Sequence, residues 1–286
     1  MLAVHSLSDA ERYCRDMARR EAKNFYWGFI SLPYHQRIAI YALYDFARQV
    51  DDETDAYGHL PDLAGRLRKH RERVEACVRG NYADDDPVMQ VLCEAVRRFD
   101  IPEDELQLLV DGVEMDVTRR RYTTWEELRT YCNLVASVVG RMCVRIFGFQ
   151  DAAALLRADD LGIALQLTNI LRDVREDAGM GRVYLPVEDL ERFGITEEAV
   201  LANEPGAGWN ALIAFEAERA RAYFEKGYRV LDYIDRRPAA CVRTMAGIYD
   251  RILEKISRDP ELPLRTRTGL THAEKIGTMV RAWLVV

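Results

Sequence analysis

Residues 155–177, LLRADDLGIALQLTNILRDVRED, give the strongest indication of the fold. Their apolar residues recur around most of a helix, which is typical of a helix buried inside a bundle. Polar residues interrupt them at spacings of three or four, so they share one narrow face. Carboxylates on such a face need water, a ligand or a metal ion, because unpartnered buried charges are costly. The members of this stripe are Gly162, Gln166, Asn169, Asp173 and Asp177.

Residues 38–55, IAIYALYDFARQVDDETD, form a second helical stretch with acids on one face. Together the two stretches predict carboxylate pairs that face each other across a cavity. Oxygen ligands one turn apart suit Mg²⁺, which keeps several waters and bridges to phosphate oxygens. Arg48 and Arg172 lie within about one turn of the acids and could bind diphosphate oxygens directly. The residues that share this second face are Tyr41, Tyr44, Arg48, Asp51 and Asp55.

Simpler interpretations of these acids stay open. A single D-x-x-x-D pattern on a helix is usually a solvated face. Salt bridges within each helix also fit the spacing, from Arg48 to Asp51 or Asp52 and from Arg172 to Glu176. A third stretch, residues 111–122 (DGVEMDVTRRRY), could place Gly112, Asp116 and either Arg119 or Arg120 on one face. Its three successive arginines are, however, more typical of a solvated helix end than of a site.

The composition indicates a globular protein, with 49% apolar and 30% charged residues among 286. Lys and Arg number 40 against 47 Asp and Glu, a net charge of −7, which argues against nucleic acid bound by bulk charge. The first 20 residues contain no apolar run typical of a secretory signal. The longest apolar runs, residues 38–44 and 134–139, are far shorter than the about 20 residues of a spanning helix.

The six cysteines show no C-x-x-C pattern and no regular spacing. We therefore expect buried, reduced thiols in a cytoplasmic protein rather than a disulfide framework or a zinc site. Prolines are absent from residues 34–60 and 103–185, and such long stretches rich in Ala, Leu, Arg and Glu favour helix. Since no connection resembles a domain linker, the sequence predicts a single all-α domain, residues 1–286.

These motifs together resemble the squalene/phytoene synthases, which join two prenyl diphosphates head to head. The resemblance runs from about residue 24 to residue 275. Its most specific part is residues 166–177 followed by GRVYLP at 181–186, and residues 41–55 and 131–140 match further motifs. The resemblance implies a single-domain isoprenoid synthase fold, an all-α bundle around a central cavity.

The resemblance also assigns roles to individual residues. The Mg²⁺ ligands it implies are Asp51, Asp55, Asp173 and Asp177. The residues implied to complete the metal and diphosphate shell are Arg48, Gln166, Asn169 and Arg172. Residues of the carboxyl-terminal part implied to contact diphosphate are Arg267 and Lys275. The tyrosines implied to lie near the reacting carbons, as catalytic residues, are Tyr44, Tyr131 and Tyr249.

Bulky side chains at Phe29 and Tyr41 would close the end of the pocket for the prenyl tail. They favour farnesyl (C15) over geranylgeranyl (C20) diphosphate, and hence a C30 product: presqualene diphosphate, squalene or dehydrosqualene. Phytoene synthesis from two C20 chains is the nearest alternative. A head-to-tail elongator fits the DDxxD pattern of residues 51–55 but not the second motif, and a non-catalytic assembly or binding relative should have lost aspartates.

The resemblance bears on cofactors and location as well. Mg²⁺ is the expected cofactor, and the sequence leaves NADPH open, because members of this family use no G-x-G-x-x-G fold for it. We expect no membrane-spanning tail like that of larger eukaryotic relatives. We expect a cytoplasmic protein, with peripheral contact at the inner face of the membrane available for release of an apolar product.

Overall fold

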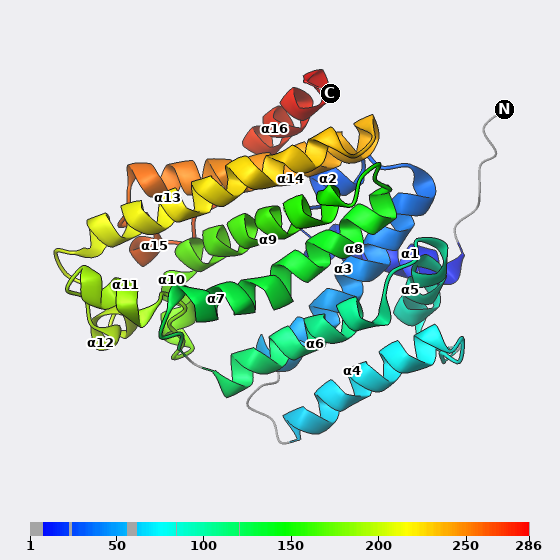
Figure 1. The fold of residues 1–286 in the computed structure, drawn as a ribbon, viewed down its shortest axis with the longest axis horizontal. Helices are drawn as coiled ribbons and strands as arrows, with labels where there is room; N and C mark the ends of the chain where they lie inside the picture. The colour runs from blue at the N-terminus through cyan, green and yellow to red at the C-terminus, as the bar shows by residue number, and fades with distance from the viewer. Residues whose placement is uncertain (1–7, 23–24, 56–61, 84, 120, 286) are drawn as a thin grey trace.

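The computed structural model describes residues 8–22, 25–55, 62–83, 85–119 and 121–285, with Asp55 and Val117 described by their backbone alone. Across these ranges every regular element is a helix, and the one extended feature is an isolated bridge between Arg121 and Val183. The prediction of an all-α bundle is confirmed (Figure 1). Across the same described ranges, no helix is both long enough and apolar enough to cross a membrane.

The helices follow one another along the chain without long irregular connections. They are α1 (Asp9–Glu21), α2 (Tyr26–Phe29), α3 (Tyr34–Asp55), α4 (Leu63–Val78), α5 (Pro87–Arg98), α6 (Glu103–Thr118), α7 (Trp125–Cys132), the π-helical η1 (Asn133–Ser137), α8 (Val138–Phe147), α9 (Ala153–Arg172), α10 (Val174–Gly179), α11 (Val187–Arg192), α12 (Glu197–Leu201), α13 (Trp209–Gly227), the 3₁₀-helical η2 (Tyr228–Asp232), α14 (Arg236–Arg258), α15 (Leu262–Arg265) and α16 (His272–Leu284).

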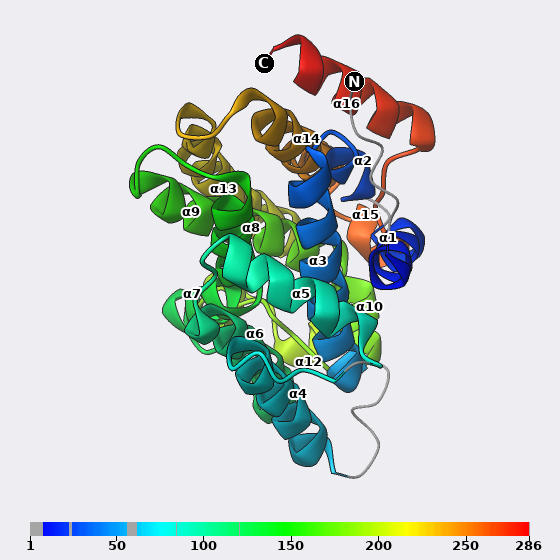
Figure 2. The ribbon, with the colours of Figure 1, turned by 90° about the vertical axis from the view of Figure 1, so that its right-hand side faces the viewer.

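The helix α9 runs through the middle of the bundle and packs on α13, α8, α14 and η1 (Figure 1). Its apolar residues are buried nearly all round, as the sequence predicts for a central helix. The helix α3 packs against α1, α5 and α6, and α16 lies on the outside of α14 and α2 (Figure 2). The acidic stretch of residues 38–55 therefore belongs to α3, and that of residues 155–177 spans α9 and α10.

The expectation of one continuous helix over residues 155–177 is wrong. The helix α9 ends at Arg172, and Asp173 adopts φ −101° and ψ 11° before α10 begins at Val174. The helical backbone hydrogen bonds continue through the bend. The Asp173 amide donates to Asn169 O at 2.9 Å, and the Asp177 amide donates to Asp173 O at 2.9 Å. The bend coincides with a carboxylate that arginines hold from two sides, a tertiary contact that local periodicity does not encode.

The π-helical turn η1 lies where two glycines allow close approach. A Cβ at Gly162 of α9 would lie 2.6 Å from the Cα of Ser137, and one at Gly112 of α6 would lie 3.0 Å from the carbonyl carbon of Leu134. Only glycine fits such contacts, so η1 is wedged between α6 and α9. Widened turns of this kind often occur beside functional sites, and here Val135 of η1 lines a cavity.

The expectation that all six cysteines are reduced is wrong for two of them. Cys77 of α4 and Cys93 of α5 form a disulfide, with their Cα atoms 5.2 Å apart. This spacing is ordinary for a disulfide, and it arises because the turn after α4 brings α5 back alongside it. The sequence gives no sign of the pairing, since 16 residues separate the two. The free cysteines are Cys14, Cys132, Cys143 and Cys241.

Candidate active site

A cavity of about 440 Å³ lies beside the bend between α9 and α10. It collects acids from both predicted stretches, because Asp51 of α3 lines it together with Asp173 and Asp177. The side chain of Asp55 lies outside the described part of the chain. The polar lining consists of Arg48, Asp51, Thr54, Asp116, Tyr131, Gln166, Asn169, Arg172, Asp173, Glu176, Asp177, Arg182, Tyr184 and Arg267. The apolar lining is limited to Val135, Ile170 and Met180.

The Asp173 carboxylate is held by two guanidinium groups. Arg172 donates from Nε to Oδ1 at 2.7 Å and also from Nη2 to Oδ2. Arg267 donates from Nε to Oδ1 at 2.8 Å and from Nη2 to Oδ2 at 3.2 Å. Burial alone would raise the pKa of Asp173, but the bonds to both arginines outweigh it and lower the pKa. The carboxylate is thus ionised at neutral pH.

Arg172 is itself buried, with 8% of its surface exposed. Burial would lower its pKa, but the bonds to Asp173 and the contact with Tyr249 outweigh this and raise the pKa. Arg172 pairs with Asp173 rather than with Glu176, its intrahelical alternative. Arg48 pairs with Asp52 at 2.5 Å, which is one of the intrahelical alternatives.

The described acidic side chains of residues 51–55 (DDETD) point to different partners. Asp51 lines the cavity, whereas Glu53 accepts from Arg66 at 2.7 Å and lies 3.1 Å from His70 Nε2 on α4. The pairing of Arg48 with Asp52 was one of the salt-bridge alternatives, and it leaves Arg48 in the cavity lining beside Asp51. Among the described side chains of this stretch, the helical period directs Asp51 to the cavity and Asp52 and Glu53 to other partners.

The donors around the cavity fit Mg²⁺ that is shared with a phosphate ligand. The Oδ1 atom of Asn169 is buried with no hydrogen-bond partner in the described part of the protein, while its Nδ2 donates to Gln166 at 3.3 Å. An orphaned amide oxygen beside carboxylates is a hard donor of the kind that Mg²⁺ prefers. Three acids do not converge on one point within the described ranges. Mg²⁺ tolerates this, since it uses one or two carboxylates with water and substrate phosphates.

Asp116 joins two tyrosines at the wall of the cavity. Tyr131 donates to Asp116 Oδ2 at 3.1 Å and Tyr184 donates to Oδ1 at 2.8 Å, with the two rings stacked at 5.4 Å. Burial, and after it the charge of Asp116, raises the pKa of both tyrosines above the usual range. Both hydroxyls therefore stay protonated, and both aromatic rings are fixed in position.

The sequence alone assigned no site role to Asp116 or Tyr184, although both belong to stretches that it singled out. The pairing of Gly112 with Asp116 one turn apart was a visible signal, since the glycine admits η1 and the acid then reaches Tyr131. Tyr184 belongs to the GRVYLP motif, so its presence could also have been inferred. Further lining residues that the sequence did not single out are Thr54, Glu176 and Met180.

The other predicted aromatic residues form a cluster apart from the cavity lining. Phe29 meets Tyr41 edge-on at 6.0 Å and Tyr44 at 6.1 Å, and Phe25 stacks on Tyr249 at 5.5 Å. We call these five residues the aromatic cluster. Arg172 links it to the cavity, because its guanidinium carbon lies 5.9 Å from the centre of the Tyr249 ring.

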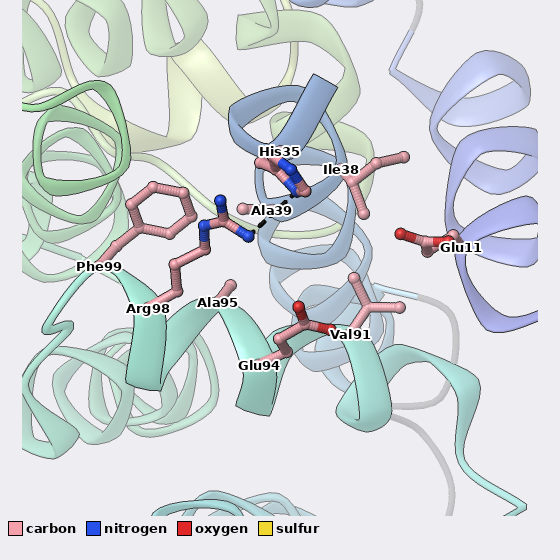
Figure 3. Close-up of a pocket in the computed structure, with 9 residues that line it drawn as sticks. All are labelled: Glu11, His35, Ile38, Ala39, Val91, Glu94, Ala95, Arg98 and Phe99. Carbon is pink, nitrogen blue, oxygen red and sulfur yellow. Dashed lines mark hydrogen bonds between the residues drawn. The ribbon is translucent and has the colours of Figure 1, made fainter. Parts of the chain in front are cut away.

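Lys275 is not part of the cavity lining and belongs to α16 instead. A second hollow lies between α3 and α5 and near α1 (Figure 3), but at about 20 Å³ it has room for little more than a water molecule. Arg98 and His35 meet there at 3.1 Å. Its lining is Glu11, His35, Ile38, Ala39, Val91, Glu94, Ala95, Arg98 and Phe99.

Comparison with known proteins gives consistent matches over nearly the whole chain. The family model of squalene/phytoene synthases matches residues 18–274. The phytoene synthase of Mycobacterium tuberculosis is 35% identical over 277 residues, which cover 94% of this chain and 89% of that protein. The presqualene diphosphate synthase of Rhodopseudomonas palustris is 35% identical over 263 residues, which cover 92% and 93%.

Solved structures agree with these matches. The squalene synthase HpnC from Alicyclobacillus acidocaldarius superimposes with a TM-score of 0.81 at 30% identity, covering 87% of this chain and 93% of that one. A dehydrosqualene synthase in complex with ligand superimposes with a TM-score of 0.87 at 27% identity, covering 96% of each chain. The all-α bundle is thus the isoprenoid synthase fold of those enzymes.

Proposed function

The chain belongs to the squalene/phytoene synthase family, and we propose that it condenses two farnesyl diphosphates through presqualene diphosphate into a C30 product. Membership makes it a prenyltransferase that joins prenyl diphosphates head to head and depends on a divalent metal such as Mg²⁺. Neither the chain length nor the end product follows from membership, because relatives at equal identity are named for C40 and for C30 chemistry.

The observation that carries the C30 proposal is the aromatic cluster. Phe29 and Tyr41 are 4% and 2% exposed, and their rings meet edge-on. Tyr41 lies ten residues before Asp51 on α3, about 15 Å along the helix axis. A prenyl tail whose diphosphate lies near Asp51 and which runs along α3 would meet these rings, and the bulk there favours the shorter C15 tail.

The polar residues of the cavity suit the ionisation of an allylic diphosphate. We assign the metal to Asp51, Asp173 and Asp177, which line the cavity with the orphaned Oδ1 of Asn169. Asp55 is added on the sequence resemblance alone. Mg²⁺, when bound, neutralises the charge that builds up on the departing diphosphate. Arg48, Arg172 and Arg267 offer guanidinium donors from the same lining, which can bind diphosphate oxygens in pairs.

The tyrosines suit the carbon chemistry that follows. Loss of diphosphate leaves an allylic cation, which the double bond of the second prenyl chain attacks; proton loss then closes a cyclopropane. Loss of diphosphate from that intermediate gives a second cation, which rearranges to a linear chain. This cation then loses a proton to give dehydrosqualene or accepts a hydride from NADPH to give squalene. Tyr131 and Tyr184, held by Asp116, present aromatic faces that stabilise a cation at close range. We place Tyr44 and Tyr249 near the same path through their contact with Phe25.

Product analysis by mass spectrometry tests this proposal. The purified enzyme receives farnesyl or geranylgeranyl diphosphate with Mg²⁺, with and without NADPH. Squalene requires a hydride from NADPH, whereas presqualene diphosphate and dehydrosqualene do not, so the arms identify the end product as well. We expect C30 products in excess. Faster turnover of geranylgeranyl diphosphate would overturn the proposal and favour phytoene synthesis, as in the relative from Mycobacterium tuberculosis.

A variant separates the assigned metal role from a structural one. Asp173→Asn removes a charge from the cavity and should lower turnover by about 100-fold or more, with helical content by circular dichroism nearly unchanged. Asp235→Asn is the matched control, because Asp235 is exposed and makes no capping hydrogen bond through its side chain. Turnover that is unaltered in Asp173→Asn would contradict the assignment.

A further inference from the structure

The helix α16 presents its apolar face to the outside. Thr278 and Ala282 are buried against the bundle, whereas Ile276, Val280 and Leu284 are 42%, 48% and 80% exposed. Surface helices of globular proteins normally show the reverse order, with charged residues outward. Of the ten large apolar side chains exposed in the described ranges, four lie on α16 or directly after it, the fourth being Val285 at 67%.

The position of α16 leaves this face uncovered. Lys255 of α14 binds Glu274 at 2.9 Å, and a Cβ at Gly247 would lie 3.0 Å from the Cγ2 of Thr278, so the inward face of α16 is fixed on α14. Figures 1 and 2 show α16 at the edge of the bundle with the other helices on one side of it. We call Ile276, Val280, Leu284 and Val285 the α16 surface.

The charges around the α16 surface are basic, although the whole chain carries −7. Residues 275–285 contain no acid. Arg281 lies about 100° from Val280 around the helix, at one side of the outward face, whereas Lys275 lies about 140° from Val280, toward the buried face. Arg281 is exposed and makes no ion pair in the described part of the protein. One border of this apolar strip is therefore cationic.

The neighbouring helix adds to this charge. The contacts of Lys255 with Glu274 and of Gly247 with Thr278 make α14 and α16 antiparallel, so the start of α14 lies at the same end as Leu284. Arg236 and Arg237 are exposed there, with Asp235 as the adjacent acid. An uncharged strip flanked by arginines is the pattern of a helix that lies in the interface of an anionic membrane.

We propose that the α16 surface docks the enzyme on the face of an anionic lipid bilayer. This inference rests on the proposed function for its purpose, because a C30 hydrocarbon or its prenyl precursor dissolves in lipid and not in water. A second copy of the chain fits the surface less well. The outward face of one helix of 13 residues is about 20 Å long, and stable protein interfaces bury about 1,200–2,000 Å².

Vesicle flotation tests the docking with the full chain and without substrate. Vesicles of phosphatidylcholine alone are compared with vesicles in which one quarter of the lipid is phosphatidylglycerol. We expect the protein to float with the anionic vesicles, and at least 10-fold less of it to float when Val280→Asp and Leu284→Asp are combined. Arg281→Gln should weaken flotation several-fold, and added salt should weaken it further. Leu156→Asp is the matched control, since Leu156 is 63% exposed on α9.

The outcomes separate this inference from the proposed function. Turnover of detergent-dispersed substrate should be unchanged in the α16 variants, because none of these side chains lines the cavity. Equal flotation of the wild type and the Val280→Asp, Leu284→Asp variant would overturn the docking even if C30 products form. A wild-type dimer in light scattering that the same variant dissociates would overturn it in favour of a second copy. If only the product assay fails, the proposed substrate is wrong and the proposed membrane docking is unaffected.

Discussion

Arg267 and Asp173 are joined by two hydrogen bonds across 94 residues of sequence, Nε to Oδ1 at 2.8 Å and Nη2 to Oδ2 at 3.2 Å. Arg172 holds the same carboxylate from the preceding residue. Both oxygens of the proposed metal ligand thus accept from arginines. A cation that coordinates Asp173 competes with these donors, and Arg267 can give way more easily, because its side chain is 56% exposed whereas that of Arg172 is 10% exposed.

Replacement of Arg267 should therefore strengthen the response to Mg²⁺ in the absence of substrate. We expect Mg²⁺ to raise the melting temperature of Arg267→Gln more than that of the wild type, measured by thermal shift. Turnover should fall at the same time, because a diphosphate donor is lost. Arg265→Gln is the control, since Arg265 pairs with Asp259 and Glu261. An equal Mg²⁺ response in wild type and Arg267→Gln would show that Arg267 does not compete.

The pH dependence of the same variant has a definite sign. The two arginines lower the pKa of Asp173 in the folded state, so they contribute stability above the ordinary carboxyl pKa of 3.8 that is lost as pH falls through the lowered value. Arg267→Gln should thus melt below the wild type at pH 7 without Mg²⁺. The difference should shrink as the pH approaches 3.

The helical periodicity of the sequence predicts several of the residues that line the cavity. Residues 155–177 place Gln166, Asn169, Asp173 and Asp177 on one face, and all four line the cavity with Asp51 of the second stretch. The bend at Asp173 could not be predicted in the same way. Local spacing describes a straight helix, whereas the bend accompanies a bond to Arg267, whose position depends on how the whole carboxyl-terminal segment folds back.

Two further features depend on contacts that the sequence does not encode locally. The disulfide of Cys77 and Cys93 requires α4 and α5 to lie side by side, and neither cysteine belongs to a recognisable motif. The triad of Asp116 with Tyr131 and Tyr184 joins residues 15 and 68 positions apart. Helical periodicity finds the face of each residue, but only packing decides which faces meet.

The aromatic cluster predicts a change in product length. Phe29→Ala should open space beside Tyr41 and let the enzyme convert geranylgeranyl diphosphate, so the ratio of C40 to C30 products should rise when both substrates are supplied. Removal of a buried ring costs about 3–5 kcal/mol, so Phe29→Leu serves as the milder variant. Phe46→Leu is the control, since Phe46 is fully buried and its ring lies 6.2 Å from that of His70. If the ratio of C40 to C30 products changed equally in Phe46→Leu, the role assigned to Phe29 in limiting the tail length would be wrong.

Asp116 and Tyr131 should act as a unit. Asp116→Asn and Tyr131→Phe each break their hydrogen bond, so each should lower turnover, and the double variant should be little worse than the stronger single one. Turnover of the four proteins gives the coupling directly. Asp160→Asn combined with Tyr131→Phe is the control, because Asp160 pairs with Arg157 and its effect should add independently. Additive losses in the Asp116 cycle would contradict a shared role.

Asp45 should make the protein less stable as pH rises. It is 2% exposed, its Oδ2 has no hydrogen-bond partner in the described structure, and burial raises its pKa from 3.8 to about 8. Between these values the unfolded chain releases the proton while the folded chain keeps it, so the free energy of unfolding falls with rising pH and levels off above about 8.

Asp45→Asn replaces the acid by an uncharged group of nearly the same shape. Its melting temperature should match the wild type near pH 4 and exceed it by a margin that grows from pH 5 to pH 8. Asp235→Asn, on an exposed acid, should show no such growth, and a constant margin for Asp45→Asn would mean that the buried carboxyl titrates normally.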